Sequence, residues 1–237
     1  EMWDADYLVC FSHAKGHGNS GFGGAIKNLA LGAMIEKSRG ALHMVQHAEK
    51  YCDAQKCTHY SDGCNKCVEA CEVNAMRFAD DQTLHVGFHE CNFCLECNEL
   101  CPTGGLTIRE EIAQDFQEVM ALATELVLSS FPGGNSVFIT LANSITPFCD
   151  CWGFSTPSLV PDIGLFASKD IVAIDKAVLD SIDAKNLIPG SIPPWLIIRD
   201  IDGHLFKKIH GKDPYWQVEA CERRGLGSSD YELEEIR

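Results

Sequence analysis

Four cysteines within a dozen residues constrain this chain more than any other feature. Residues 91–102 read CNFCLECNELCP, so the cysteines are separated by two, two and three residues, and a proline follows the last one. Three thiolates at two-residue gaps fit one tight loop around a corner of a cubane iron–sulfur cluster. In chains that carry two such clusters, the fourth cysteine ligates the other cluster. The run therefore predicts a second motif elsewhere in the chain.

A second, imperfect motif lies thirty residues earlier. Cys64, Cys67 and Cys71 align with Cys94, Cys97 and Cys101, and Met76 and Phe78 align with Leu106 and Ile108. An internal repeat of this kind indicates the pseudo-twofold symmetry of a ferredoxin-like fold. The repeat departs from the pattern in two places, because Glu72 replaces the proline and Ser61 stands where a cysteine is expected.

Three interpretations of Ser61 stay open from the sequence. Cys57 supplies the missing thiolate through a longer loop, Cys52 supplies it from further away, or the cluster has an iron that is open or ligated by serine. A zinc site is disfavoured, since zinc is usually satisfied by paired C-x2-C knuckles.

The predicted cofactors are two [4Fe-4S] clusters. The predicted ligands of one cluster are Cys91, Cys94, Cys97 and Cys71, and those of the other are Cys64, Cys67, Cys101 and Cys57.

The rest of the chain predicts an α/β fold. Apolar runs predict buried strands at 7–12, 136–142 and 163–167, and amphipathic stretches at 23–37, 107–129 and 170–182 predict helices. A capping box, Thr107 with Glu110, marks the start of the second helix. Strands that alternate with helices predict a mainly parallel sheet flanked by helices. The expected division is 1–50 and 108–237 for the α/β domain and 51–107 for the inserted ferredoxin-like α+β domain.

Polar residues follow the predicted strands, and in parallel sheets ligands bind beyond the carboxyl ends of the strands. This placement predicts an active site. Its candidate catalytic residues are His13, Lys15, His17, Cys149, Asp150 and Cys151. A mutual disulfide between Cys149 and Cys151 is expected to be strained, whereas the two thiols can share a metal or a sulfur ligand. We therefore expect an additional metal at this pair.

The glycine-rich string GHGNSGFGG, residues 16–24, precedes a predicted helix. Its backbone amides are candidates for phosphate binding at the helix start, although the string fits neither the P-loop nor the dinucleotide fingerprint. The candidate cofactor-binding residues here and in later motifs are Gly21, Gly23, Gly24, Lys27, Asn28, Asp162 and Asp170.

Charge and composition exclude other classes of protein. The formal net charge of −15 argues against nucleic acid binding. Residues 129–149 carry no formal charge, but their prolines and glycines are incompatible with a membrane-spanning helix. Because no secretory signal opens the chain, the clustered cysteines predict metal binding in the cytoplasm rather than disulfides.

Four separate motifs give the chain a family resemblance. GFGGAIKNLALG (21–32), the cysteine-rich insert, CDCWG (149–153) and VPDIGLFASKDIVAID (160–175), together with the tail GLGSSDYEL (225–233), resemble the iron–sulfur domain-of-unknown-function family 362. The resemblance implies a cytoplasmic, oxygen-sensitive protein of an anaerobe or archaeon, with a ferredoxin insert in an α/β domain. It places His13, Lys15, His17, Lys27, Asn28, Cys149, Asp150, Cys151, Asp162 and Asp170 on shared motif positions.

Two departures from that family bear on the expectations. An N-terminal segment that completes the sheet in relatives is expected to be missing here or to lie on another chain, and Ser61 breaks a set of eight cluster cysteines.

The leading hypothesis is a ferredoxin-linked oxidoreductase or a reductive maturation factor, in which electrons pass from the clusters to a substrate or metal site at the strand ends. The alternatives are a non-catalytic electron-transfer subunit and an iron or sulfur carrier. Each requires a partner protein that donates or accepts electrons.

Overall fold

The computed structural model describes residues 4–236, and its main sheet has three strands in the order β1–β6–β7. β1 (Leu8–His13) and β6 (Ser136–Ala142) are parallel, whereas β7 (Gly164–Ser168) pairs antiparallel with β6. The predicted α/β class holds, but the expectation of a mainly parallel sheet is wrong. The chain between β6 and β7 contains no crossover helix, so it turns back and β7 runs in the opposite direction.

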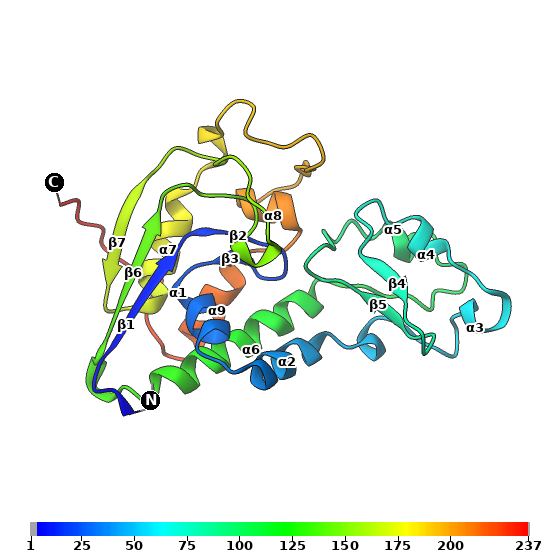
Figure 1. The fold of residues 1–237 in the computed structure, drawn as a ribbon, viewed down its shortest axis with the longest axis horizontal. Helices are drawn as coiled ribbons and strands as arrows, with labels where there is room; N and C mark the ends of the chain where they lie inside the picture. Colours follow the sequence, from blue (N-terminus) through cyan, green and yellow to red (C-terminus); the bar gives the residue numbers. More distant parts are fainter. Residues whose placement is uncertain (1–3, 237) are drawn as a thin grey trace.

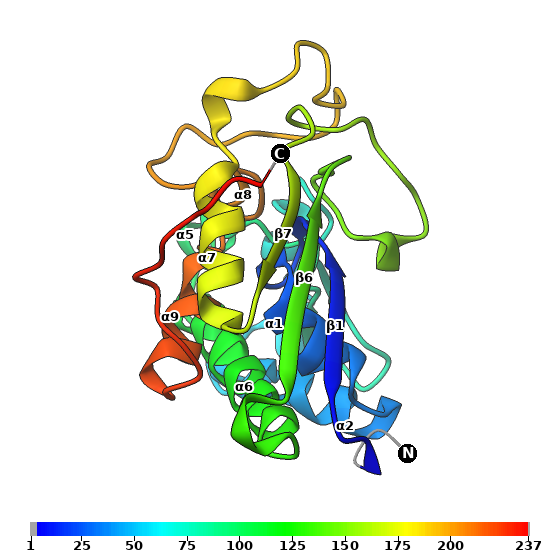
Figure 2. The same cartoon turned by 90° about the vertical axis from the view of Figure 1, so that its left-hand side faces the viewer.

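Helices cover one face of this sheet (Figure 2). Those against the sheet are α1 (Ala25–Lys27), which continues into a π-helical turn, and α7 (Ile171–Ser181). Two further helices, α6 (Glu111–Leu128) and α9 (Tyr215–Arg223), pack behind them. On the other face, Val9, Phe11 and Leu165 expose apolar side chains. In the described part of the chain, helices therefore cover one face of the sheet that was expected to be flanked by helices.

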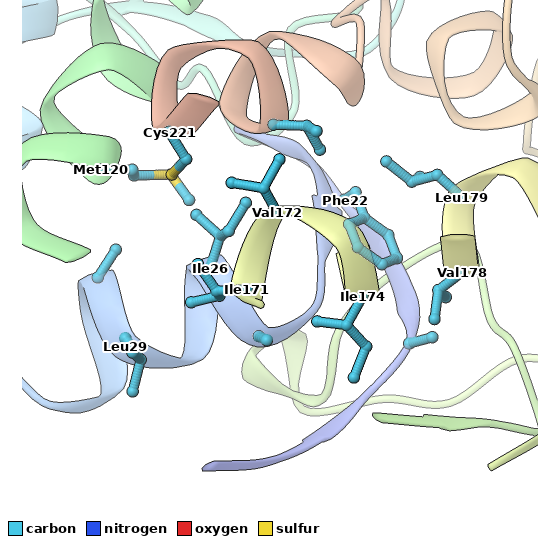
Figure 3. Close-up of a cluster of buried hydrophobic side chains, with 14 of the residues drawn as sticks. Phe22, Ile26, Leu29, Met120, Ile171, Val172, Ile174, Val178, Leu179 and Cys221 are labelled. Carbon is cyan, nitrogen blue, oxygen red and sulfur yellow. The ribbon is translucent and has the colours of Figure 1, made fainter. Parts of the chain in front are cut away.

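The main core lies between the sheet and these helices (Figure 3). Phe22, Ile26, Met120, Val172 and Cys221 pack there with almost no exposed surface. Burial alternates along β6, as expected for a strand with one face on the core. Burial of these apolar side chains is the main source of stability.

The predicted start of the long helix is wrong by four residues. α6 begins at Glu111, because the backbone N–H of Thr107 donates to the carbonyl of Tyr51 at 2.8 Å instead of entering the helix. α7 begins where it was predicted, with the carboxylate of Asp170 accepting hydrogen bonds from the N–H groups of Val172 and Ala173. This is a standard N-cap.

A hairpin and several short helical segments complete the α/β part. They are β2 (Lys15–His17), β3 (Gly21–Gly23), η2 (Asn28–Gly32), α2 (Glu36–His43), η3 (Met44–Gln46), η4 (Ala48–Lys50), η5 (Pro132–Gly134), η6 (Asp150–Trp152), η7 (Ala184–Asn186) and α8 (Leu205–His210). Among the described helices, none is long and apolar enough to cross a membrane.

The cysteine-rich segment forms a lobe beside the N-terminal end of α6 (Figure 1). It contains the hairpin β4 (Met76–Phe78) and β5 (Leu84–Val86) and the short helices α3 (His59–Asp62), α4 (Lys66–Glu69) and α5 (Glu96–Glu99). α4 and α5 occupy the same position in the two cysteine motifs, so the repeat is visible in the backbone. The lobe has its own apolar core, in which Tyr51, Met76, Val86, Phe88 and Ile108 are buried.

An isolated β-bridge joins Cys52 to Leu106 where the chain enters and leaves this lobe. The division at 51–107 stays a prediction.

Candidate functional site

Two thiol-lined cavities of nearly equal size lie in the cysteine lobe. The first, which we call the inner cavity, has an empty volume of about 350 Å³ and is lined by Cys71, Cys91, Cys94 and Cys97. The second, the outer cavity, has an empty volume of about 370 Å³ and is lined by Cys52, Cys57, Cys64, Cys67 and Cys101. Each cavity thus takes one cysteine from the other sequence motif, which is the crossed arrangement of two-cluster iron–sulfur proteins.

The donor set of both cavities suits an iron–sulfur cluster. Apart from the thiols, the lining side chains are mostly apolar, and neither lining includes a carboxylate or a histidine. Four thiolates around one zinc ion would lie about 3.8 Å from one another. Among the described residues, no three of these thiols lie within 4.8 Å of one another. The described thiols are therefore not arranged as the ligands of a single zinc ion.

Backbone N–H groups point at several of the sulfurs. The N–H of Ala75 donates to Cys71 Sγ at 3.2 Å. Burial raises the pKa of Cys101, but hydrogen bonds from the backbone at Thr103, Leu106 and Gly105 outweigh it and hold that pKa below its ordinary value. Hydrogen bonds of this kind stabilise thiolates and tune the potential of a bound cluster.

The outer cavity narrows the alternatives for the missing thiolate. Ser61 is exposed, donates its hydroxyl hydrogen to the carbonyl of Thr58 at 3.2 Å and does not line the cavity, whereas Cys57 and Cys52 both do.

We expect Cys57→Ser to remove the outer cluster and to lower the iron content from about eight to about four atoms per chain. Cys52→Ser is the matched control, because Cys52 is held in the bridge to Leu106, and this variant should keep all its iron. The measurement is iron and acid-labile sulfide in protein purified without air. The reverse pattern would make Cys52 the ligand.

The loop of the inner cavity is anchored to the α/β part. Buried Lys212, just after α8, donates from Nζ to the carbonyl of Phe88 at 2.8 Å and to that of Cys91. Arg199 Nη1 donates to the carbonyl of Asn92 at 2.9 Å. Gly211 lies so close to the same carbonyl that a Cβ would clash with it. Burial lowers the pKa of Lys212 to about 8.

A third cavity, which we call the strand-end pocket, lies at the carboxyl end of β1. Its lining is Phe11, Ser12, His13, Lys15, Gly23, Gly24, Lys27, Asn28, Leu31 and Gly32. Six predicted site residues therefore meet here: His13, Lys15, Gly23, Gly24, Lys27 and Asn28.

Two of them are fixed by backbone contacts. His13 Nε2 lies 2.6 Å from the carbonyl of Asn143, and Asn28 donates to the carbonyl of Phe11 at 2.9 Å.

The two lysines make the strand-end pocket basic. Burial, with a smaller contribution from the nearby charge of Lys15, lowers the pKa of Lys27 to about 8. Lys15 Nζ lies 3.8 Å from the carboxylate of Asp150, whose side chain is 85% exposed. Lys15 also donates to the carbonyl of His13 at 3.2 Å. An anionic group in this pocket would meet two ammonium groups and one solvent-exposed carboxylate.

Cys149 and Cys151 form a disulfide, with their Cα atoms 5.4 Å apart. That separation is within the ordinary range for a disulfide. Cys149 is buried and Cys151 is exposed. Lys27 Nζ lies 4.0 Å from Cys149 Sγ, which connects the pair to the pocket. The additional metal at this pair stays a prediction.

His17 is buried beside the disulfide. A ring nitrogen of His17 and the two sulfurs lie within 4.8 Å of one another. Nδ1 accepts hydrogen bonds from the backbone N–H groups of Asn19 and Ser20 at 3.3 and 3.2 Å, which leaves Nε2 for other contacts. Burial, together with nearby positive charges, holds the pKa of His17 well below its ordinary value.

Two of the backbone amides at the helix start, where phosphate binding was predicted, already have a partner in the structure. The N–H groups of Ala25 and Ile26 donate to Asp175 at 2.8 and 2.9 Å, so the carboxylate already occupies this position. A Cβ at position 24 would clash with the carboxylate of Asp175, so the position requires glycine. Gly21, the first residue of β3, adopts a positive φ of 74° and lies against the backbone of Lys212 instead of lining the pocket.

Two other candidates are structural. Asp162 accepts a hydrogen bond from the N–H of Ser144 at 2.7 Å and closes the loop after β6. Asp170 caps α7 and also binds the N–H of Ser228 at 2.9 Å. Because β7 is antiparallel to β6, Asp170 lies at the opposite end of the sheet from the pocket. The predicted convergence of three strand ends is therefore wrong for the third strand.

Sequence reasoning missed the residues that join the two parts. The ring of His89 lies between the lobe and the strand ends, with its centroid 5.3 Å from that of His17, 5.6 Å from that of His43 and 6.3 Å from that of Trp152. In the sequence, only its position two residues before Cys91 indicated that His89 lies near the cluster motif.

Comparison with known proteins agrees with these features. Over 47 residues, the chain is 32% identical to a protein named "Ferredoxin" from Methanothermococcus thermolithotrophicus, a match that covers 20% of this chain and 78% of the ferredoxin. The match and the thiol-lined cavities indicate an iron–sulfur protein of the electron-transfer class. Residues 1–180 match the family described as "Domain of unknown function (DUF362)", and the chain belongs to that family. No solved structure gives a significant match.

Proposed function

We propose that this chain is an iron–sulfur redox enzyme or reductive maturation factor that passes electrons from two [4Fe-4S] clusters to an acceptor in the strand-end pocket. Cys71, Cys91, Cys94 and Cys97 would hold the inner cluster, and Cys57, Cys64, Cys67 and Cys101 the outer one. Such clusters supply electrons one at a time at low potential. The donor would be a small electron-transfer protein.

The observation that carries this proposal is the attachment of the inner loop to the strand ends. Lys212 binds the carbonyls on both sides of His89, and His89 contacts His17, which lies beside the Cys149–Cys151 disulfide. A lobe that served only to dock a partner would not need a packed connection to a polar pocket. In this arrangement, electrons from the donor enter at the outer cavity, which lies further along the lobe.

The pocket residues favour an anionic acceptor. Lys15 and Lys27 supply positive charge, and His13 and Asn28 hold the pocket wall in place through backbone contacts. The partly buried position of Lys27 strengthens its attraction for an anion compared with a lysine in water.

We expect Lys27→Met to slow the oxidation of the reduced protein by an anionic quinone sulfonate about tenfold, because one close charge contributes about 1.4 kcal/mol. A neutral quinone should oxidise the same variant at the wild-type rate. Lys37→Met, which removes a charge from the exposed surface of α2, is the matched control. The measurement is stopped-flow bleaching of the cluster absorbance.

Equal effects of Lys27→Met and Lys37→Met on the anionic quinone would contradict the role of the pocket. The clusters would then serve the alternative function, a non-catalytic electron-transfer subunit.

A further inference from the structure

The disulfide between Cys149 and Cys151 has no evident structural purpose. It closes a loop of only three residues, and the entropy that a disulfide removes from the unfolded chain falls as the loop shortens. The other eleven cysteines are free. A short disulfide in such a chain is more typical of redox chemistry, in which one sulfur is reached from solvent and the other is protected.

The surroundings of the two sulfurs differ in the way a redox pair requires. Cys151 is exposed, whereas the side chain of Cys149 is 1% exposed and lies 4.0 Å from Lys27 Nζ. An ammonium group at that distance stabilises a thiolate on Cys149. A ring nitrogen of buried His17 lies within 4.8 Å of both sulfurs.

A packed connection leads from the inner cavity to this pair. His89 follows Phe88, whose carbonyl is fixed by Lys212, and its ring contacts those of His17 and Trp152. Gly18 lies against the carbonyl of His89 too closely for a Cβ, so the two segments touch along their backbones as well. Trp152 directly follows Cys151 in the chain.

From this arrangement we infer that Cys149 and Cys151 form a redox-active disulfide that collects two electrons arriving singly through the cysteine lobe and makes them available as a pair at the strand-end pocket. This inference rests on the proposed function, and it names the disulfide as the first acceptor of the electrons that leave the clusters. The ultimate reductant is a low-potential one-electron donor.

The step balances as follows. Two electrons enter, the S–S bond breaks, Cys149 becomes a thiolate beside the Lys27 ammonium group, and Cys151 takes one proton from water and becomes a thiol. Oxidation by a two-electron acceptor in the pocket re-forms the S–S bond and releases the electrons and the proton.

The test is an anaerobic reductive titration with reduced methyl viologen. Wild type is expected to take up about four electrons per chain, one for each cluster and two for the disulfide, and Cys149→Ser/Cys151→Ser about two. After acid quenching and alkylation, the wild-type peptide that contains residues 149–151 should carry two alkyl groups. Cys149→Ala/Cys151→Ala repeats the titration if the serine variant is unstable.

A lobe variant tests the path. In Cys97→Ser, which is expected to lack the inner cluster, alkylation at residues 149 and 151 should fall at least tenfold in the time that labels wild type. Cys10→Ser, a change in the main core, is the control and should label like wild type.

Two results would overturn the inference. In the first, wild type takes up only two electrons, its disulfide stays intact, and EPR detects the reduced clusters. That result would overturn the role of the disulfide but would not contradict the proposed clusters. The other is equally fast labelling in Cys97→Ser. Absence of any cluster signal would instead contradict the proposed function itself.

Discussion

Serine at both Cys71 and Cys94 is expected to leave about four iron atoms per chain, whereas serine at both Cys71 and Cys101 is expected to leave none. The reason is that Cys71 lines the inner cavity with Cys94, although it belongs to the other sequence motif, and Cys101 lines the outer cavity. A cluster that loses thiolate ligands is not retained. Iron, sulfide and visible absorbance of protein purified without air are the measurements.

The pair Cys67→Ser/Cys101→Ser is the matched control for this experiment and should also keep about four iron atoms, now in the inner site. If each motif instead held its own cluster, Cys71→Ser/Cys94→Ser would lose both clusters. That outcome would contradict the crossed arrangement and the ligand sets built on it.

Asp175→Ala is expected to be the most destabilising single change in the α/β part. The buried carboxylate accepts the first two N–H groups of the helix at α1, and its removal leaves both without a partner in the core. Unsatisfied buried donors cost about 1–3 kcal/mol each, so the free energy of unfolding should fall by about 3 kcal/mol at pH 6. The measurement is the urea midpoint of the far-ultraviolet circular dichroism signal. Asp115→Asn, at a half-exposed ion pair with Lys50, should change stability by less than about 1 kcal/mol.

The effect of Asp175→Ala should also depend on pH. Burial raises the pKa of Asp175 to about 7 in the folded protein, although its two N–H partners act in the opposite direction. The carboxyl group of the unfolded chain titrates near 4, so the folded state retains a proton that the unfolded state loses, and stability falls as pH rises toward 7. Wild type should therefore lose about 1.4 kcal/mol from this group between pH 6 and pH 8, and Asp175→Ala should not. An equal change in both proteins would contradict the raised pKa.

Local patterns predicted the parts of the molecule whose chemistry is contained in short segments. The cysteine spacing predicted which thiols gather in each cavity, because tight loops and short helices such as α4 and α5 are determined by neighbouring residues. The helix α7 and the strand β6 were predicted for the same reason.

Features that depend on distant residues were not predicted. The direction of β7 depends on the path of a loop that has no periodic pattern. Asp175 lies 150 residues from Ala25 in the chain, and its carboxylate replaces the phosphate expected at the helix start. Lys212 likewise reaches Cys91 across 121 residues. Nothing in the local sequence at either end of these contacts distinguishes them from ordinary core or surface positions.

The central claim is that the cysteine lobe binds cubane iron–sulfur clusters, and direct chemical analysis tests it best. Protein purified without air should be brown and contain about eight iron atoms and about eight acid-labile sulfides per chain, with an EPR signal of reduced [4Fe-4S] clusters after dithionite. A colourless protein that contains stoichiometric zinc and no inorganic sulfide would contradict the account.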